Sequence, residues 1–261
     1  MQMLSASQEG QLLDVSRPVI ATRADIDHPH AIAAHQHPRG QLLYAIKGTM
    51  QITAGQQSRY VTAQQAVWIP PQVSHAITAT GELAYRSLYI DPLAANQLAN
   101  TVTYHEVSNL LRELIVEAAT FGHRYQPNSA ESRLIAVLYD KLQAMPHADL
   151  TLRLPTHPRL RLLCDALLQE VANDTTLQQW SQVLGLSSRS LARLFQVETG
   201  LSFIRWREHL RLMRAIEQLR QGSSVTTVAL ECGYASISAF STMFRRTLKQ
   251  SPRHYLKQRP H

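Results

Sequence analysis

The chain has 261 residues, 44% of them apolar and 17% charged, which suits a globular protein long enough for two ordinary domains. No apolar run reaches the roughly 18 residues of a membrane span. The first residues, MQMLSASQEGQLLDV, lack the basic and apolar regions of a signal peptide, so we expect a cytoplasmic protein without a membrane partner. The cysteines, Cys164 and Cys232, lie inside apolar helical patterns, which predicts reduced, buried thiols and no disulfide framework.

Basic residues are concentrated in the second half of the chain. Residues 1–151 contain 10 Lys and Arg against 12 Asp and Glu, whereas residues 152–261 contain 16 against 7. This asymmetry predicts an electropositive surface on the C-terminal part, as expected for a polyanion partner. A solvated basic face would give the same count, so charge alone does not decide between the two.

Short runs of strand-like composition fill the region from residue 19 to residue 90, with Gly and Pro between them. Their spacing predicts a small β-sandwich or β-barrel and argues against a helical domain. The runs are residues 19–26, 41–48, 49–55, 57–63, 66–70, 75–81 and 83–90.

Three histidines of this region are candidates for one shared site. His35 and His37 lie two residues apart on a strand and so point to one face, and His75 on a later strand can converge with them. With the amide oxygen of Gln41, three imidazoles suit Ni, Zn, Fe or Mn better than Ca or Mg. Because glutamine is a poor ligand, two interpretations stay open. The histidines hold a divalent transition metal, or they line a metal-free effector pocket together with Gln41.

Polar residues beside this cluster are expected to lie outside the site. His28 and His30 belong to the DHPH segment beside prolines, which predicts loop or pocket-rim positions. Arg39 follows the histidine pair in a turn, where it could pair with an anionic effector, but we expect it to be exposed to solvent. Strand alternation predicts that one face of the last run carries Tyr85, Ser87 and Tyr89.

Helical periodicity replaces the strand pattern after the barrel region. It predicts a helix over residues 105–122, with Gly122 as its stop, and a helix over residues 129–145, with Ser129 as its N-cap. Both have wide apolar faces, so one could cover the barrel while the other meets a second subunit in a homodimer. A purely intramolecular helical layer is the alternative. The proline-containing residues 146–157 predict a linker.

The C-terminal part contains one unit repeated twice: a short helix, a turn with a glycine, and a second helix. The copies cover residues 177–200 and 225–252, and a helix over residues 202–222, roughly 30 Å long, joins them. In the first copy we expect Thr175 or Thr176 and Ser187 or Ser188 as N-caps, and Gly200 as the stop of the second helix. Alignment of Gly185 with Gly233 sets the register of the repeat. It places Ser187 over Ala235, Leu191 over Ala239 and Phe195 over Met243. Two such units on a rod of this length can enter successive major grooves of double-stranded DNA, about 34 Å apart.

Several motifs resemble those of known families. SVTTVALECGYASISAFSTMFRRTLKQSPRHY resembles the signature of the AraC/XylS transcription regulators, and LSSRSLARLFQVETGLSFIRWREHLRL resembles their first helix-turn-helix. HQHPRGQLLYAIKG and VWIPPQVSHAI resemble the two cupin motifs, except that Gln41 stands where metal cupins usually have Glu. The family often has a cupin barrel in front. The resemblance therefore implies an α+β protein of two domains, with an N-terminal cupin-like β-barrel plus helices and a C-terminal all-α tandem helix-turn-helix.

The first recognition helix offers the stronger chemistry for reading bases. Helical spacing gives it an outward face of Arg189, Ser190, Ala192, Arg193 and Gln196. The resemblance implies base-reading positions at Arg189, Ala192 and Arg193. An arginine can read guanine bidentately, so we expect this unit to supply most of the direct readout.

The second recognition helix offers weaker hydrogen-bonding groups. The resemblance places its base-reading positions at Ile237, Ser238 and Thr242, which predicts a unit that positions more than it specifies. We expect Arg245 and Arg246 on the same helix to contact phosphates.

These inferences predict a transcription regulator, and not an enzyme, that binds double-stranded DNA under the control of a small molecule or metal in the barrel. Effector binding would shift the equilibrium between states that differ in DNA binding. The alternative is a metal-dependent cupin enzyme fused to a DNA-binding domain. RNA polymerase is a further partner open to such a regulator, and activation and repression both stay open. The expected barrel, helical connector with dimer interface, linker and DNA-binding domain cover residues 1–95, 96–145, 146–157 and 158–261.

Overall fold

The computed structural model describes residues 17–258 except residues 56, 64, 80, 122–124 and 149. The chain divides into two compact units, Met1–Thr151 and Leu152–His261, with the boundary inside the predicted linker. The first unit is a β structure with helices, and the second is helical apart from one short strand, so the predicted α+β class is confirmed. No helix in the described part of the chain is long and apolar enough to cross a membrane.

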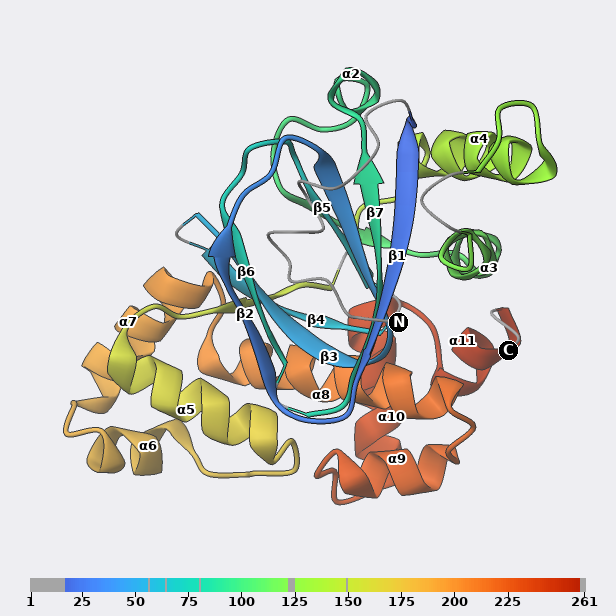
Figure 1. Cartoon of the computed structure of the whole chain (residues 1–261). Coiled ribbons are helices and arrows are strands. Elements are labelled where there is room, and N and C mark those ends of the chain that lie inside the picture. The colour runs from blue at the N-terminus through green and yellow to red at the C-terminus, as the bar shows by residue number, and fades with distance from the viewer. Residues whose placement is uncertain are drawn as a thin grey trace. The chain divides into compact units, whose positions relative to one another are not determined.

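Antiparallel strands form two sheets in the N-terminal unit, and one long strand belongs to both (Figure 1). One sheet has the order β1-β7-β3-β5-β8 and the other has the order β4-β3-β6-β2. The strands are β1 Val19–Ile26, β2 His30–His35, β3 Gly40–Ala54, β4 Gln57–Thr62, β5 Gln65–Ile69, β6 His75–Ala79, β7 Leu83–Ile90 and β8 Thr103–Glu106. The sequence predicts all of these regions except β2 and β8.

Gly48 allows β3 to serve both sheets. The sequence predicts two strands over residues 41–48 and 49–55, but the structure has one strand of 15 residues that changes sheet at this glycine. Gly48 has φ +81°, and a Cβ atom there would lie 2.1 Å from the carbonyl oxygen of Glu82. Glycine is therefore required at this position by both its backbone conformation and the close approach of β7.

The N-terminal unit contains two buried apolar clusters, one on each face of the first sheet. Between the sheets, side chains such as Leu43, Met50 and Ile77 form one buried cluster. On its other face the first sheet packs against α3 (Asn109–Ala118) and α4 (Ala130–Gln143), which lie side by side in Figure 1. The short α2, Pro92–Ala95, follows β7. The buried polar residues His37, Gln41 and His75 belong to neither apolar cluster.

The first predicted connecting helix is shorter than expected. Residues 103–106 pair with β5 as β8, and the Ser108 hydroxyl accepts a hydrogen bond from the Leu111 N–H and so begins α3. A strand this short gives too little alternation to be detected beside a helical pattern. The predicted stop, Gly122, lies outside the described residues. The second helix is confirmed, with Ser129 as its N-cap.

The C-terminal unit begins with β9, and its predicted helix caps are present. Thr176 caps α6 through a capping box, and Ser187 caps α7. Gly200 ends α7 in the left-handed region, at φ +79°. The elements are β9 Leu152–Leu154, α5 Pro158–Gln169, α6 Leu177–Val183, α7 Ser188–Thr199, α8 Phe203–Arg220, α9 Val225–Glu231, α10 Ile237–Leu248 and α11 Pro252–Gln258. The helix-turn-helix units are therefore α6–α7 and α9–α10, with α8 between them.

The register of the repeat differs by one residue from the predicted one. The second turn, from Gly233 to the N-cap Ser236, holds one residue more than the turn from Gly185 to the N-cap Ser187. Alignment of the glycines therefore shifts the second recognition helix. Alignment of the N-caps instead pairs side chains that are all fully buried, namely Leu191 with Phe240 and Phe195 with Phe244.

The corrected register also matches the helix ends and predicts a stabilising substitution. It pairs Gly200 with Lys249, which ends α10 at φ +60° although it carries a side chain. A non-glycine residue in this region costs roughly 1 kcal/mol. We expect Lys249→Gly to raise the free energy of unfolding by about 0.5–1 kcal/mol, measured by urea unfolding followed by circular dichroism. Thr247→Gly, inside the same helix, should lower it, and a fall for both variants would contradict the assigned cap.

Candidate functional site

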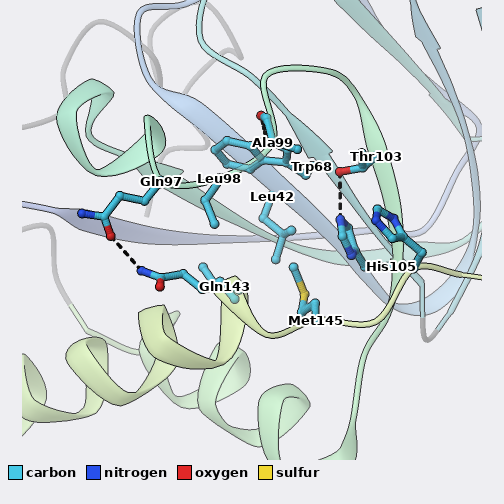
Figure 2. A pocket seen from close by; sticks show the side chains of 11 residues that line it. Leu42, Trp68, Gln97, Leu98, Ala99, Thr103, His105, Gln143 and Met145 are labelled. Atoms are coloured by element: carbon cyan, nitrogen blue, oxygen red, sulfur yellow. Dashed lines mark hydrogen bonds between the residues drawn. The ribbon is translucent and has the colours of Figure 1, made fainter.

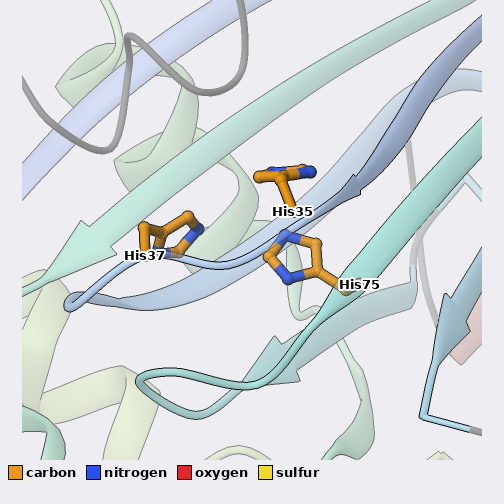
Figure 3. Close-up of side chains that lie close together, drawn as sticks. All are labelled: His35, His37 and His75. Atoms are coloured by element: carbon orange, nitrogen blue, oxygen red, sulfur yellow. The ribbon is translucent and has the colours of Figure 1, made fainter.

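Three histidine side chains meet in the N-terminal unit (Figure 3). His35 ends β2, His37 lies just before β3, and His75 begins β6. The ring centroids are 4.3 Å apart for His35 and His75, 5.2 Å for His37 and His75, and 5.9 Å for His35 and His37. One ring nitrogen of each lies within 4.8 Å of those of the other two. The sequence-predicted cluster is therefore assembled by the fold.

Backbone carbonyl oxygens hold the same nitrogen, Nδ1, in each of the three rings. Each Nδ1 lies 2.7–2.9 Å from a backbone carbonyl oxygen, in the pairs His35 with Ala33, His37 with Arg39 and His75 with Val73. A carbonyl oxygen can only accept, so Nδ1 carries the proton and Nε2 presents a lone pair. The buried Nε2 of His75 has no hydrogen-bond partner among the described residues. Histidines that ligate metals are commonly held in this way through their second nitrogen.

Burial keeps the Nε2 lone pairs of His37 and His75 free of protons. Desolvation lowers the pKa of His75 to about 4, although the hydrogen bond to Val73 acts in the opposite direction. Desolvation also lowers the pKa of His37, against its hydrogen bonds to Gln41 and Arg39. Both rings are therefore neutral at pH 7, the form in which imidazole binds a metal.

Gln41 belongs to the cluster through a network of side-chain hydrogen bonds. Its Oε1 lies 3.2 Å from Nε2 of His37, and its Nε2 donates to the Ser87 hydroxyl (3.1 Å) and to the Tyr89 hydroxyl (3.2 Å). Since Nδ1 of His37 already holds the proton, two acceptor atoms face each other. That contact is favourable with a cation beside it, or with the amide rotated so that its NH₂ group donates to His37. Ser87 and Tyr89 are both buried on the face of β7 that alternation predicts.

Two predictions about the surroundings of the cluster need correction. Arg39 is 2% exposed rather than solvated, and it donates to the carbonyl oxygen of Arg17 (2.9 Å) and lies 3.9 Å from Asp91. The prediction failed because strand pairing brings these distant residues over the turn. His28 lies outside the strands, as predicted, and is exposed, but His30 begins β2 and does not lie in a loop.

A separate hollow of about 180 Å³ lies beside the last turn of α4 (Figure 2). Polar groups on its wall already bond to one another. Gln143 donates to Gln97 (3.1 Å), and the Thr103 hydroxyl lies 2.8 Å from Nε2 of His105. Trp68 donates to the carbonyl oxygen of Ala99 (2.6 Å), again within the same wall. The hollow therefore offers few free donors or acceptors, and the histidine cluster is the stronger candidate for an effector site.

The exposed face of α7 carries the residues predicted to read bases. Arg189 and Arg193 are exposed and have no hydrogen-bond or ion-pair partner within the described ranges, so both guanidinium groups are free. The other predicted outward residues, Ser190, Ala192 and Gln196, are also exposed. Of these, Ser190 accepts from the Ser187 hydroxyl and Gln196 donates to the Gly200 carbonyl oxygen. Their contacts with DNA stay a prediction.

The exposed face of α10 has fewer free donors. Ile237 is 45% exposed, and the Thr242 hydroxyl donates to the carbonyl oxygen of Ser238 on its own helix. Arg246 forms an ion pair with Glu208 of α8 (2.5 Å), and Arg245 donates to Ser241 (3.4 Å). In the corrected register Ser238 matches Arg189 and Thr242 matches Arg193, so the weaker chemistry lies at equivalent positions.

Comparison with known proteins identifies both halves of the chain. Residues 17–172 match the AraC-like ligand binding domain, and residues 180–258 match a helix-turn-helix domain. The chain belongs to the AraC family of transcription regulators. It is 38% identical over 224 residues to the HTH-type transcriptional regulator NimR of Escherichia coli K12, a match covering 85% of this chain and 81% of NimR.

Other relatives of this AraC-family chain are similar over a smaller part or at lower identity. The HTH-type transcriptional activator RhaS of Escherichia coli SE11 is 38% identical over 96 residues, 36% of this chain and 34% of RhaS. The solved structure of ToxT from Vibrio cholerae has 11% identity, covers 94% of this chain and 100% of that one, and gives a TM-score of 0.39.

Membership in the AraC family decides the class of function. The chain is a DNA-binding transcription regulator with an N-terminal ligand-binding domain. Its relatives are transcription regulators and not enzymes, so the alternative of a cupin enzyme fused to a DNA-binding domain is set aside. The identity of the ligand remains to be derived from the site.

Sequence reasoning missed the buried Arg211 in the helical unit of this AraC-family protein. Its guanidinium group donates to four carbonyl oxygens at 3.1–3.3 Å, those of Val171, Ala172, Asn173 and Gly233. It therefore ties the end of the first helical segment to the turn of the second helix-turn-helix. The signal was available, because Arg211 lies between Leu210 and Leu212 in an apolar stretch of the long helix.

Glu198 of α7, also missed, predicts a pH dependence of stability. Its carboxylate accepts from the backbone N–H of Thr156 (2.8 Å), the Thr156 hydroxyl (2.8 Å) and the N–H of His157 (3.3 Å), and these bonds lower its pKa below 4.5. A depressed pKa gives stability that is present above the unfolded value and is lost as the pH falls through the folded value.

We therefore expect Glu198→Gln to lower the free energy of unfolding by about 1 kcal/mol at pH 7, with the difference from wild type shrinking as the pH falls below 4.5 through the lowered pKa of the folded state. Thermal unfolding between pH 7 and pH 3.5 measures this. Asp174→Asn, an exposed carboxylate without a hydrogen bond among the described residues, is the control. A difference that stays constant down to pH 3.5 would contradict the assigned bonds.

Both cysteines are buried and free, as predicted. Burial raises the pKa of the Cys164 thiol strongly and that of the Cys232 thiol to about 11. The thiols are therefore protonated and unreactive at neutral pH.

Proposed function

We propose that this regulator is controlled by a divalent transition metal, of the group Ni, Zn, Fe and Mn, held by Nε2 of His35, His37 and His75. The observation that carries the proposal is the hydrogen-bond pattern that the three rings share. Each Nδ1 is held by a carbonyl oxygen, the ligand atoms lie within 4.8 Å of one another, and the buried Nε2 of His75 has no partner among the described residues.

The donor set fits such an ion. Three imidazoles favour borderline metals, and the Gln41 oxygen beside His37 can add a weak oxygen ligand. A bound ion would supply a positive charge that offsets the contact between two acceptors. A small polar molecule at the same residues is the second candidate, because the hydrogen-bonded network of Gln41, Ser87 and Tyr89 offers neutral polar groups.

Ligation would act on the barrel by joining three of its strands. His35 belongs to β2, His75 to β6, and His37 lies at the entry to β3. An ion bound to all three favours the conformations in which these strand ends lie together, and so shifts the population of barrel states. The physical consequence for DNA is a change in how the N-terminal unit constrains the C-terminal one.

On the DNA side, Arg189 and Arg193 read guanine in the major groove, and α10 positions the protein on the adjacent groove. Support comes from the two free guanidinium groups on one exposed face of α7, compared with the internally bonded Thr242 on α10. A homodimer through α3 and α4 completes the proposal, since these helices expose Leu110 (55%) and Val137 (46%).

Isothermal titration of chelator-treated protein with Zn²⁺ and Ni²⁺ tests the metal proposal. We expect one ion per chain, and His75→Ala should weaken binding by about a hundredfold or more because it removes a ligand. Gln41→Glu should strengthen binding, because a carboxylate is a better ligand than an amide.

His105→Ala is the matched control, because it removes an imidazole of the same unit that lies outside the cluster. It should leave the affinity unchanged. Absence of binding in the wild type, or equal affinity in His75→Ala, would overturn the metal as effector and leave the small polar molecule.

A further inference from the structure

A second cavity of the N-terminal unit lies away from the histidines. Its volume is about 350 Å³, and it is bounded by the start of β1 and by one face of α4. The walls are mostly apolar and are contributed by Pro18, Val19, Tyr125, Pro127, Ile135 and Tyr139. Small-molecule sites have volumes of about 300–1,000 Å³ and apolar walls with a few polar groups, so this cavity has the size and lining of one.

The polar groups of the tyrosines in this wall are already used. The Tyr125 hydroxyl donates to the carbonyl oxygen of Val19 (3.0 Å), and the Tyr139 hydroxyl donates to that of Ala94 (2.6 Å). Their rings therefore face the cavity as fixed apolar surfaces. A ligand that enters meets hydrocarbon and aromatic carbon on these sides.

Arg17 places an uncompensated positive charge at the cavity. Its guanidinium group lies 5.2 Å from the centre of the Tyr125 ring, and its Nε is buried without a hydrogen-bond partner in the part of the chain that the structure describes. No carboxylate pairs with Arg17 among these residues, whereas neighbouring Arg39 has Asp91 at 3.9 Å. A buried donor on a cation that lacks an acceptor is costly, and an anion supplied by a ligand would satisfy it.

We propose that this cavity binds an amphipathic organic anion, whose apolar body lies between β1 and α4 and whose carboxylate or sulfonate pairs with Arg17. The site is distinct from the histidine cluster and does not depend on metal binding. Because α4 forms one of its walls, the ligand adds a contact that fixes this helix against the barrel.

Fluorescence titration with 1-anilinonaphthalene-8-sulfonate tests this, since the probe is an aromatic anion. The full-length protein is expected to bind one probe molecule, and decanoate is expected to displace it. Arg17→Gln should weaken binding about tenfold or more by removing a charge-assisted hydrogen bond. Ala136→Trp should abolish binding by filling the cavity, because Ala136 is an exposed residue of α4 that lines it.

Arg133→Gln is the matched control, because it removes a positive charge from the same helix at a residue that does not line the cavity. It should bind the probe as the wild type does. Equal affinity in Arg17→Gln and Ala136→Trp, or no binding by the wild type, would overturn the proposal. The probe titration measures neither metal binding nor DNA binding. A failure of the cavity proposal can therefore be told apart from a failure of the proposed function.

Discussion

Arg189→Ala combined with Arg193→Ala is expected to remove sequence-specific DNA binding while the protein stays folded. Each bidentate contact between arginine and guanine contributes about 1–3 kcal/mol of discrimination, so the double variant should bind its operator about a hundredfold more weakly or worse. Both residues are exposed and unbonded among the described residues, and their loss leaves the buried face of α7 intact. Gel-shift titration with a duplex selected by the wild type from random DNA measures the effect.

A charge control separates base reading from general attraction to phosphate. Arg245→Ala combined with Arg253→Ala also removes two positive charges from the same unit. It should weaken specific and random DNA by a similar factor, because phosphate contacts carry no sequence information. If both double variants lost the preference for the operator over random DNA to the same extent, the proposal that α7 reads bases would be contradicted.

Arg211→Met is expected to lower the free energy of unfolding by about 3 kcal/mol, the largest stability effect among the substitutions considered. The methionine keeps an apolar stem but leaves four carbonyl oxygens, including those of Ala172 and Gly233, without their donor. The two segments that Arg211 joins are closely packed, since even a Cβ atom added at Gly233 would lie 2.7 Å from the Ala172 oxygen. The backbone therefore has little room to move and give these carbonyl oxygens other partners. Urea unfolding of the full chain, followed by helical circular dichroism, measures the loss.

Arg205→Met provides the comparison on the same helix. Arg205 is exposed, so its replacement should change stability by less than about 0.5 kcal/mol. Arg211→Lys should recover only part of the loss, because an ammonium group cannot reach the carbonyl oxygens that a planar fork serves. If Arg211→Met lowered the free energy of unfolding by less than 1 kcal/mol, the four hydrogen bonds would not be what holds residues 171–173 to the turn at Gly233.

Local signals in the sequence predicted the elements that depend on local physics. A serine or threonine directly before an amphipathic helical pattern predicts the N-cap, which is why Ser129, Thr176 and Ser187 could be predicted. A glycine after the last helical residue likewise predicted the end of α7 at Gly200. The predicted convergence of His35, His37 and His75 is confirmed, but the predicted reason is wrong, because His35 ends β2 and His37 lies in the turn before β3, not on the same strand.

The features that the sequence did not predict depend on contacts between distant residues. Arg39 is buried beside Arg17 and Asp91, which are distant in the sequence, and the residues of its own turn do not predict either neighbour. The register of the repeat was misjudged because one extra residue in the second turn moves Phe244, and not Met243, onto the position of Phe195. The glycines mark turns, but the buried side chains set the alignment.

The orientation of the imidazoles is the part of the site that only the structure supplies. Sequence predicts that His35, His37 and His75 converge, but it cannot say which nitrogen of each ring faces the others. The carbonyl oxygens of Ala33, Arg39 and Val73 determine this, because each accepts a hydrogen bond from Nδ1 of one ring. This pattern leaves Nε2 of each ring as the nitrogen that no backbone carbonyl oxygen holds.

Operator affinity measured with and without added Zn²⁺ or Ni²⁺, at one fixed salt concentration, tests most directly whether the histidine cluster controls DNA binding. For the wild type we expect the metal to change the dissociation constant by about tenfold, the usual size of coupling between two sites. His75→Ala should show no such change while still selecting its operator over random DNA. An identical dissociation constant with and without metal in the wild type would contradict the account.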